Sequence, residues 1–387
     1  MKKVFSVLFM LVFALCLVGC GGSKEDTIKI GSVGPLSGPV SIYGVAVKEG
    51  VELAIEEINN AGGVNVNGVM KKLELVDFIN DEANADKAGA ALATLLESDV
   101  DVIVGAVTSG ATEGLITEAI KVGIPVITPT GTADKLTVGE KGDERQERLN
   151  IFRACFYDSY QGKYMAQYTK DAGYDKAYVL FNNDDDYSVG LKDAYVTTAN
   201  ELGLTVASQG FGLETKDFSS FWNPIISGGY KCVYIPEYYE NVYNILKAGY
   251  AAGYDGVCYG GDGWDGVVKQ IKEGDNVDFL EKCFYTNHYF GLSESQAVKT
   301  FVSKYQEKYG TVPVSFAALG YDAVYIVKQA IEQAKSVDYE DVVAALTNGT
   351  FTGLVTSATE FKFDANGNPE KAATVITFKN GKEVEAK

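Results

Sequence analysis

Short runs of β-branched and apolar residues alternate with longer stretches of helical periodicity along most of this 387-residue chain. Residues 28–33 predict a strand, and residues 44–60 carry apolar side chains every three or four positions, which predicts a helix. The pattern continues with predicted strands at 73–78, 100–105 and 125–128 and predicted helices at 85–98 and 112–121. Such alternation favours a parallel sheet covered by helices on both faces.

A charged loop at residues 139–150 interrupts this alternation, which then starts again. The second unit has predicted helices at 160–173 and 190–202 and predicted strands at 176–181, 204–207, 232–235, 257–259 and 283–285. Two more predicted helices, 296–309 and 316–335, precede a closing segment with a turn at 364–367. Two similar units predict two α/β lobes, which a chain of this length can accommodate.

The first twenty residues have the layout of a secretory signal peptide. Lys2 and Lys3 precede an almost wholly apolar run at 4–18, which is short for a membrane span. The run ends at Leu17-Val18-Gly19-Cys20, which resembles the bacterial lipobox, in which a Cys after a small residue is lipidated. We predict that residues 1–19 are removed, that Cys20 carries lipid, and that residues 20–27 form a flexible tether. The alternative is an ordinary cleaved signal in which Cys20 stands by chance.

The charge of the chain narrows the range of partners. Lys and Arg number 34 against 52 Asp and Glu, which gives a formal net charge of −18. A chain this acidic is a poor partner for nucleic acid and is repelled by anionic lipid headgroups. A lipid anchor rather than a basic patch would therefore hold it at a membrane.

Few residues support metal or acid–base chemistry. Cys155, Cys232, Cys258 and Cys283 are widely spaced and form no CxxC pair, so no metal site is predicted. We favour four buried thiols, with one disulfide as the alternative. His288 is the only histidine and is expected to be a hydrogen-bonded structural residue. Since there is also no Gly-x-Ser-x-Gly elbow, we expect neither an enzyme nor a bound cofactor.

Polar residues follow the predicted strands, at the edge where parallel sheets bind ligands. In the first unit, Ser109 stands at the start of a helix and residues 129–132 supply further hydroxyls, a combination that suits a carboxylate. In the second unit, residues 182–187, 236–239 and 260–264 supply tyrosines and acids, which suit an apolar group and an ammonium. Together these segments predict a site for a zwitterion with a side chain.

Most of these residues also have a structural interpretation. Ser109 alone is equally consistent with a helix N-cap. Residues 184–186 resemble a calcium loop but lack the EF-hand spacing, so we expect a solvated turn there. At most one of the adjacent Tyr238 and Tyr239 is expected to face a cleft. Asp262 is the strongest candidate, because glycines on both sides allow a ligand to approach the backbone closely.

Taken in order, these segments resemble the leucine/isoleucine/valine-binding protein family, the type I periplasmic binding proteins that feed ABC importers. The resemblance runs from about Ile28 to Lys379 and is carried by Ile28-Lys29-Ile30-Gly31, residues 34–39, Ile127-Thr128-Pro129 with Thr132 and Leu136-Thr137, Tyr160-Gln161-Gly162, and residues 216–219. It implies a two-lobed type I fold, each lobe a mostly parallel sheet flanked by helices, hinged by crossover segments. Residues 28–152 plus 285–357 would form lobe 1, and residues 153–284 plus 358–387 lobe 2.

The resemblance also implies roles for residues of lobe 1. Ser109 matches the Ser that binds the ligand carboxylate. Thr132 matches a Thr that contacts the ligand's main-chain groups, and Thr130 stands where a backbone carbonyl accepts a hydrogen bond from the ligand ammonium. Thr108 departs from the pattern, because it and residues 80–84 lack a Cys pair that some members bridge. Its hydroxyl would lie near the side-chain pocket, so strict aliphatic specificity is not implied.

Aromatic and acidic residues match the rest of the family's cleft. Tyr187 and Tyr238 match two cleft tyrosines, and Tyr43 matches an aromatic residue near the ligand side chain. Asp262 matches an acidic partner of the ligand ammonium. The best-known members carry Glu at this position, so the Asp is one methylene shorter.

The implied function is that of an extracytoplasmic lipoprotein that captures a free α-amino acid, with branched-chain or other apolar side chains favoured. It would close around the ligand by hinge bending, deliver it to an ABC permease and ATPase complex, and act as a monomer. One alternative is a ligand-sensing domain of a signalling system, although the sequence shows no signalling segment. The other is a binding protein for a short amide, a urea or an aromatic acid, which Asp262 disfavours because such ligands lack a cationic group.

Overall fold

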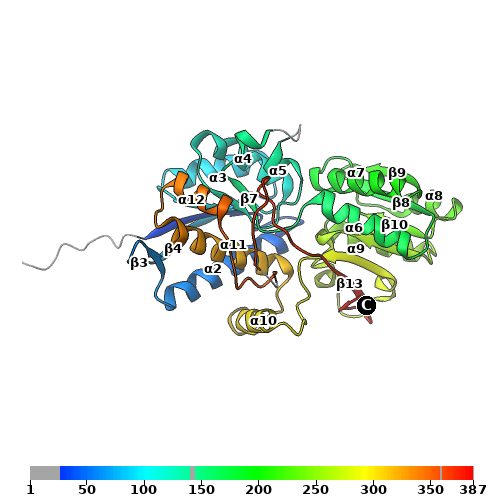
Figure 1. Ribbon diagram of the computed structural model, residues 1–387. Helices are drawn as coiled ribbons and strands as arrows, with labels where there is room; N and C mark the ends of the chain where they lie inside the picture. The colour runs from blue at the N-terminus through cyan, green and yellow to red at the C-terminus, as the bar shows by residue number, and fades with distance from the viewer. Residues whose placement is uncertain (1–26, 140–143, 358–359, 387) are drawn as a thin grey trace, which may run out of the picture.

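The computed structural model describes residues 27–139, 144–357 and 360–386, and it shows two α/β lobes side by side (Figure 1). The predicted signal peptide and Cys20 lie outside the described residues. Within those residues, no helix combines the length and the apolar character that a membrane span requires. The fold is the predicted one, with a mostly parallel sheet flanked by helices in each lobe.

The sheet of the first lobe has five parallel strands in the order β4-β1-β5-β6-β7. β1 (Ile28–Gly34) pairs on one side with β4 (Leu73–Asn80) and on the other with β5 (Val102–Val104). β6 (Val126–Thr128) and β7 (Ile151–Arg153) complete it. Because the strand order reverses at β1, the segments after β1 and β5 diverge and leave a space at the carboxyl edge of the sheet.

Helices cover both faces of this sheet. The first face packs against α2 (Ser41–Asn60) and α11 (Ser315–Ala334), and the second against α3 (Ala85–Leu96) and α4 (Ser109–Val122). In β5, Val102 and Val104 belong to the first core and Ile103 to the second, as the two-residue period of a strand requires. Other elements of this lobe are α5 (Lys135–Val138), α10 (Gln296–Tyr309), α12 (Tyr339–Asn348) and the 3-10 turn Glu144–Glu147.

The sheet of the second lobe has seven strands in the order β14-β13-β12-β11-β10-β8-β9. Its parallel strands are β8 (Lys176–Asn182), β9 (Thr205–Phe211), β10 (Cys232–Ile235), β11 (Val257–Gly260) and β12 (Cys283–Asn287). The antiparallel strands β13 (Thr374–Lys379) and β14 (Lys382–Glu385) extend it beyond β12. The strand order reverses at β8, so this lobe also has a space at its carboxyl edge.

The second sheet is likewise covered on both faces. The helices are α6 (Asp158–Asp171) and α7 (Asp186–Glu201) on one face and α8 (Trp222–Ser227) and α9 (Tyr239–Ala251) on the other. Short 3-10 turns follow at Ser219–Phe221, Asp262–Trp264, Val267–Gln270 and Asp278–Leu280. Cys155, Cys232, Cys258 and Cys283 are buried and free. The structure therefore has the four buried thiols that we favoured rather than a disulfide between two of them.

Several helices begin earlier than the sequence predicts. α4 starts at Ser109 rather than at 112, and α7 starts at Asp186 rather than at 190. The first turn of each of these helices carries polar residues, so the apolar periodicity becomes visible only in the second turn. These polar first turns lie at the carboxyl edge of the sheets.

The chain crosses between the lobes three times. The first crossing follows β7, close to the predicted boundary at 152. β12 extends through Asn287, so residues 285–287 belong to the second sheet and not to lobe 1 as predicted. Phe363 packs against Phe152 of β7, and Asn368 accepts a hydrogen bond from Thr137 in α5. From these contacts we propose that the third crossing lies after residue 369 and not at 357.

Candidate functional site

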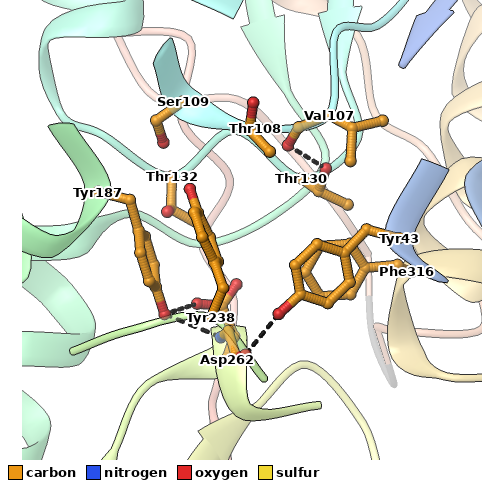
Figure 2. A pocket seen from close by; sticks show the side chains of 11 residues that line it. Tyr43, Val107, Thr108, Ser109, Thr130, Thr132, Tyr187, Tyr238, Asp262 and Phe316 are labelled. Carbon is orange, nitrogen blue, oxygen red and sulfur yellow. Dashed lines mark hydrogen bonds between the residues drawn. The ribbon is translucent and has the colours of Figure 1, made fainter. Parts of the chain in front are cut away.

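The eight residues predicted for the site surround one cavity between the two lobes (Figure 2). Tyr43, Thr108, Ser109, Thr130 and Thr132 come from the first lobe, and Tyr187, Tyr238 and Asp262 come from the second. Val107, Gly263 and Phe316, which were not among the predicted site residues, complete the lining. The cavity has a volume of about 10 Å³, roughly the room of one water molecule. The lobes are therefore closed on each other.

The topology explains why residues so far apart in sequence meet. Thr108 and Ser109 follow β5, Thr130 follows β6, and Asp262 follows β11, each at the carboxyl end of its strand. Tyr238 follows β10 in the same way. The carboxyl edges of the two sheets face each other across the gap between the lobes, so loops from both edges contribute to the cavity.

The helix α4 begins at the cavity wall. Its N-cap residue is Thr108, whose side chain makes no capping hydrogen bond, and Ser109 is the first residue of the helix. The interpretation of Ser109 as an N-cap is therefore wrong. The Oγ of Ser109 accepts a hydrogen bond of 3.2 Å from the backbone N–H of Ala133, which leaves the hydroxyl proton of Ser109 free to donate. A helix start with free N–H groups and a hydroxyl donor can hold a carboxylate.

Two hydroxyl residues hold the neighbouring loop in place. Thr130 donates a hydrogen bond of 2.6 Å to the carbonyl of Val107, which ties the loop after β6 to the loop after β5. The carbonyl of Thr132 accepts a hydrogen bond of 2.9 Å from the backbone N–H of Asp158, at the start of α6. Burial raises the pKa of the Asp158 carboxyl well above its ordinary value, and the Thr132 hydroxyl partly opposes this shift.

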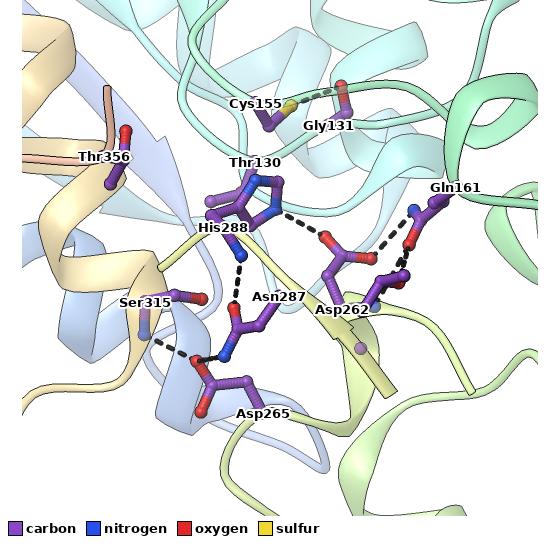
Figure 3. A network of polar contacts seen from close by, with 12 residues as sticks. Thr130, Gly131, Cys155, Gln161, Asp262, Asp265, Asn287, His288, Ser315 and Thr356 are labelled. Carbon is purple, nitrogen blue, oxygen red and sulfur yellow. Dashed lines mark hydrogen bonds and ion pairs between the residues drawn. The ribbon is translucent and has the colours of Figure 1, made fainter. Parts of the chain in front are cut away.

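Asp262 lies on the opposite side of the cavity and is only 1% exposed. Its Oδ1 accepts hydrogen bonds from the Tyr187 hydroxyl at 2.9 Å and from Nε2 of Gln161 at 3.0 Å. Its Oδ2 lies 3.0 Å from Nε2 of His288 (Figure 3). Hydrogen-bond donors stabilise the negative charge of a buried carboxylate, so Asp262 can act as the anionic partner of a cation.

The glycines beside Asp262 make room for the side chains that hold this carboxylate. A Cβ added to Gly261 would lie 2.7 Å from the Tyr187 hydroxyl and 2.9 Å from Oε1 of Gln161. A Cβ added to Gly263 would lie 2.8 Å from the same hydroxyl. The sequence predicted that these glycines allow close approach by a ligand, and Gly263 does line the cavity; both glycines also admit the side chains that hold Asp262.

Sequence reasoning did not identify Gln161 and His288 as part of the site. Gln161 lies within α6 and belongs to the Tyr160-Gln161-Gly162 segment that supported the family resemblance, so a signal existed for it. His288 had no local signal. Burial lowers its pKa to about 4, although the hydrogen bond to Asp262 acts in the opposite direction. The imidazole is therefore neutral at pH 7 and donates through Nε2 to Asp262.

Aromatic rings form the remaining wall. Tyr43 stacks on Phe316 with ring centroids 4.0 Å apart, and Tyr238 stacks on Tyr187 with centroids 4.8 Å apart. Tyr43 and Tyr238 meet edge to face at 5.7 Å. Tyr239 does not line the cavity, in agreement with the expectation that only one of the adjacent tyrosines faces the cleft. These rings can enclose an apolar group.

Direct contacts join the two lobes around the cavity. The Tyr43 hydroxyl donates a hydrogen bond to the carbonyl of Gly263, and the Tyr239 hydroxyl accepts one of 3.3 Å from the backbone N–H of Ile42. On another side of the gap, Nζ of Lys135 lies 3.2 Å from Oδ2 of Asp186. A ligand several times larger than a water molecule reaches the cavity only after these contacts separate.

The acidic segment before α7 has a structural role. Asp185 is the N-cap of α7 and accepts a hydrogen bond of 3.0 Å from the backbone N–H of Ser188. Among the described residues, no cluster of three or more His, Cys, Asp and Glu side chains could hold a metal ion. The segment at 184–186 is thus a helix cap rather than only a solvated turn.

Comparison with known proteins agrees with this geometry. The sequence profile of the periplasmic binding protein family matches residues 27–383. Leu/Ile/Val-binding protein homolog 3 of Brucella melitensis is 30% identical over 336 residues, which are 86% of this chain and 86% of that protein.

Solved structures show the same two-lobed fold. The leucine binding protein LivK of Thermotoga maritima superposes with a TM-score of 0.83 at 29% identity, covering 93% of this chain and 98% of that chain. The branched-chain amino acid binding protein LivJ of Streptococcus pneumoniae, solved in complex with isoleucine, superposes with a TM-score of 0.81 at 29% identity, covering 93% of this chain and 100% of that chain. The profile match and these likenesses span nearly all of the described residues, and this chain belongs to the periplasmic binding protein family.

Proposed function

We propose that the protein captures a free α-amino acid between its lobes and delivers it to the permease and ATPase of an ABC importer. Branched-chain or other apolar side chains are the favoured ligands. In this role the protein binds and releases its ligand unchanged, without a cofactor, and acts as a monomer. Relatives named for leucine, isoleucine and valine support this proposal.

The proposal rests mainly on one observation, the arrangement of charged and polar groups around the cavity. A buried carboxylate, Asp262, and the start of helix α4 at Ser109 lie on opposite sides of one cavity. The carboxylate complements an ammonium, and the helix start complements a carboxylate. The aromatic wall around Tyr43 and Phe316 complements an apolar side chain. An α-amino acid presents these three groups at once.

Closure of the lobes supplies the mechanism. In the proposed cycle, the lobes separate about the crossing segments, the amino acid docks on one lobe, and closure brings the other lobe's polar groups onto it. The contacts Tyr43 to Gly263 and Lys135 to Asp186 form only when the lobes meet. A permease can therefore distinguish the loaded closed form from the open form by the relative position of the lobes.

A thermal-shift screen tests this function. At a 100-fold excess over Kd, a ligand that binds only the folded state adds about 2.7 kcal/mol of stability, which is readily measured. We expect free apolar amino acids to raise the melting temperature, and their amides and deaminated analogues to have little effect. Mass spectrometry of denatured protein would identify any ligand that copurifies. A screen in which only sugars, amides, ureas or aromatic acids stabilise the protein would contradict the proposal.

We also propose that Cys20 anchors the protein to the outer face of the cell membrane. Membership of the periplasmic binding protein family places the chain outside the cytoplasm. The sequence Leu17-Val18-Gly19-Cys20 supports lipidation, and the polar residues after it would let the lobes stand away from the membrane. An anchored binding protein stays close to its permease, which raises the effective concentration of the pair.

A further inference from the structure

His288 lies where ligand recognition and the lobe crossings meet. It directly follows β12 (Cys283–Asn287), in the segment that leads from the second lobe to the first. Its side chain is wholly buried, and its Nε2 lies 3.0 Å from Oδ2 of Asp262 (Figure 3). A crossing segment therefore contacts the carboxylate that faces the cavity.

The imidazole is fixed by its neighbours. It stacks on Phe156, which lies in the first crossing segment, with ring centroids 3.8 Å apart and an interplanar angle of 23°. The backbone N–H of His288 donates a hydrogen bond of 2.7 Å to Oδ1 of Asn287. Phe156 of the first crossing thus holds the ring by stacking, and Asn287 holds the backbone of the second crossing at His288.

The same network reaches the first lobe. The Asn287 amide donates a hydrogen bond of 3.2 Å to Oδ2 of Asp265, which also accepts one of 2.6 Å from the backbone N–H of Ser315. Ser315 is the first residue of α11, and the next residue, Phe316, stacks on Tyr43 in the cavity wall. The backbone position of His288 is therefore linked to the position of α11.

The two oxygens of Asp262 are not equivalent. Oδ1 accepts hydrogen bonds from both Tyr187 and Gln161, and two donors occupy both of its lone pairs. Oδ2 accepts from His288, and its second lone pair is left for a further donor. A ligand ammonium would therefore bind at Oδ2, the oxygen that His288 holds.

We propose that His288 is a positioning residue for amine recognition, which orients Asp262 so that Oδ2 meets the ligand ammonium. This inference rests on the proposed function as an amino-acid binding protein. If His288 had a purely structural role, its replacement would weaken the binding of all ligands alike, in proportion to the loss of folding stability. The distinction can be tested because the ligand's amino group can be replaced while its carboxylate and side chain are kept.

The test compares two variants and two ligands by titration calorimetry. His288→Leu removes the donor, whereas in His288→Gln the amide nitrogen can take the place of Nε2. The ligands are leucine and 2-hydroxy-4-methylpentanoate, which lacks the ammonium. We expect His288→Leu to weaken leucine binding about tenfold or more while changing the hydroxy acid little. His288→Gln should retain most of the preference for leucine.

Two outcomes would overturn the inference. One is a His288→Leu variant that keeps the wild-type preference for leucine over the hydroxy acid, and the other is a His288→Gln variant as impaired as His288→Leu. If no amino acid binds the wild-type protein at all, the proposed function fails, and the following measurement still tests the geometry.

Nitrogen NMR of the wild-type protein requires neither ligand nor variant, because His288 is the only histidine in the sequence. The charged groups that act on the ring are Asp262 and Lys371. We expect one neutral tautomer with the proton on Nε2 from pH 5 to pH 8. A neutral imidazole with its proton on Nδ1 would show that Nε2 does not donate to Asp262 as inferred.

Discussion

The hydroxyl of Tyr43 on the first lobe donates a hydrogen bond to the carbonyl of Gly263 on the second lobe, beside the cavity. This bond exists only when the lobes are closed. Removing the hydroxyl with Tyr43→Phe leaves the buried carbonyl unpaired, so we expect closure, and with it ligand affinity, to weaken by about 1–3 kcal/mol. Titration calorimetry measures the affinity, and Tyr305→Phe is a matched control, since the Tyr305 hydroxyl bonds Glu49 within the first lobe. Equal affinities for the two variants would contradict the prediction.

The charge of Asp262 gives the sharpest test of amine recognition. Asp262→Asn keeps the shape of the side chain and removes the negative partner of a buried ammonium. We expect a loss of about 2–5 kcal/mol in the free energy of amino-acid binding, measured by calorimetry. Asp255→Asn, at the opposite end of β11, should bind normally. Near-wild-type binding by Asp262→Asn would mean that the ligand has no ammonium, or that another acid holds it.

Recognition of the ligand carboxylate should depend less on any single group than recognition of the ammonium does. Ser109→Ala removes one hydroxyl donor, but the backbone N–H groups at the start of α4 remain. We therefore expect a smaller loss of binding free energy, about 1–3 kcal/mol. Calorimetry with the amino acid and with its amide should show that the variant reduces the preference for the free carboxylate. A loss of binding free energy as large as that of Asp262→Asn would mean that the ligand carboxylate, and not the ammonium, makes the main ionic contact.

Glu237 predicts a pH dependence of stability. Burial, aided by the nearby Asp185, raises its pKa from 4.5 to about 8, so the folded protein binds this proton more tightly than the unfolded chain does. The resulting stability is fully present below pH 4.5 and is lost as the pH rises through 8. The side chain of Glu237→Gln stays neutral at every pH. Between pH 5 and pH 9, the free energy of unfolding of this variant should therefore rise by on the order of a few kcal/mol relative to that of the wild type. Thermal melts across that range measure the difference, which would be constant if Glu237 were freely solvated.

Lipidation at Cys20 predicts the location of the protein in its host. Cys20→Ser should release the protein from membranes while amino-acid binding stays unchanged, because the tether precedes both lobes. Fractionation of cells that express each form, followed by calorimetry on the released protein, measures both properties. Wild-type protein found wholly in the soluble fraction would contradict the anchor.

The sequence predicted both lobes but not all of their elements, since strands β7, β13 and β14 and helices α8, α9 and α12 were not predicted. Strand–helix alternation identified both lobes because each element repeats an apolar period that is local in the chain. The hairpin of β2 (Val64–Val66) and β3 (Val69–Lys71) was missed, although Asn67-Gly68 is a strong turn signal. The closing turn was predicted correctly: the N–H of Gly367 bonds the carbonyl of Asp364.

The cavity residues that followed strands could be predicted, because the carboxyl edge of a parallel sheet is defined by topology. Gln161 and His288 could not be predicted in this way. Gln161 sits within a helix and His288 in a crossing segment, and their contacts with Asp262 depend on how the two lobes are joined. Long-range contacts of this kind leave no periodic trace in a sequence.

Neither lobe is built from one continuous stretch of chain. The first sheet is covered by α11, which follows the whole parallel part of the second sheet in sequence, and the second sheet is completed by β13 and β14 near the C-terminus. A growing chain can therefore finish neither lobe until most of its length has been made. For a protein that carries an export signal as proposed, this order of assembly delays folding during synthesis and keeps the chain able to pass through a narrow translocation channel.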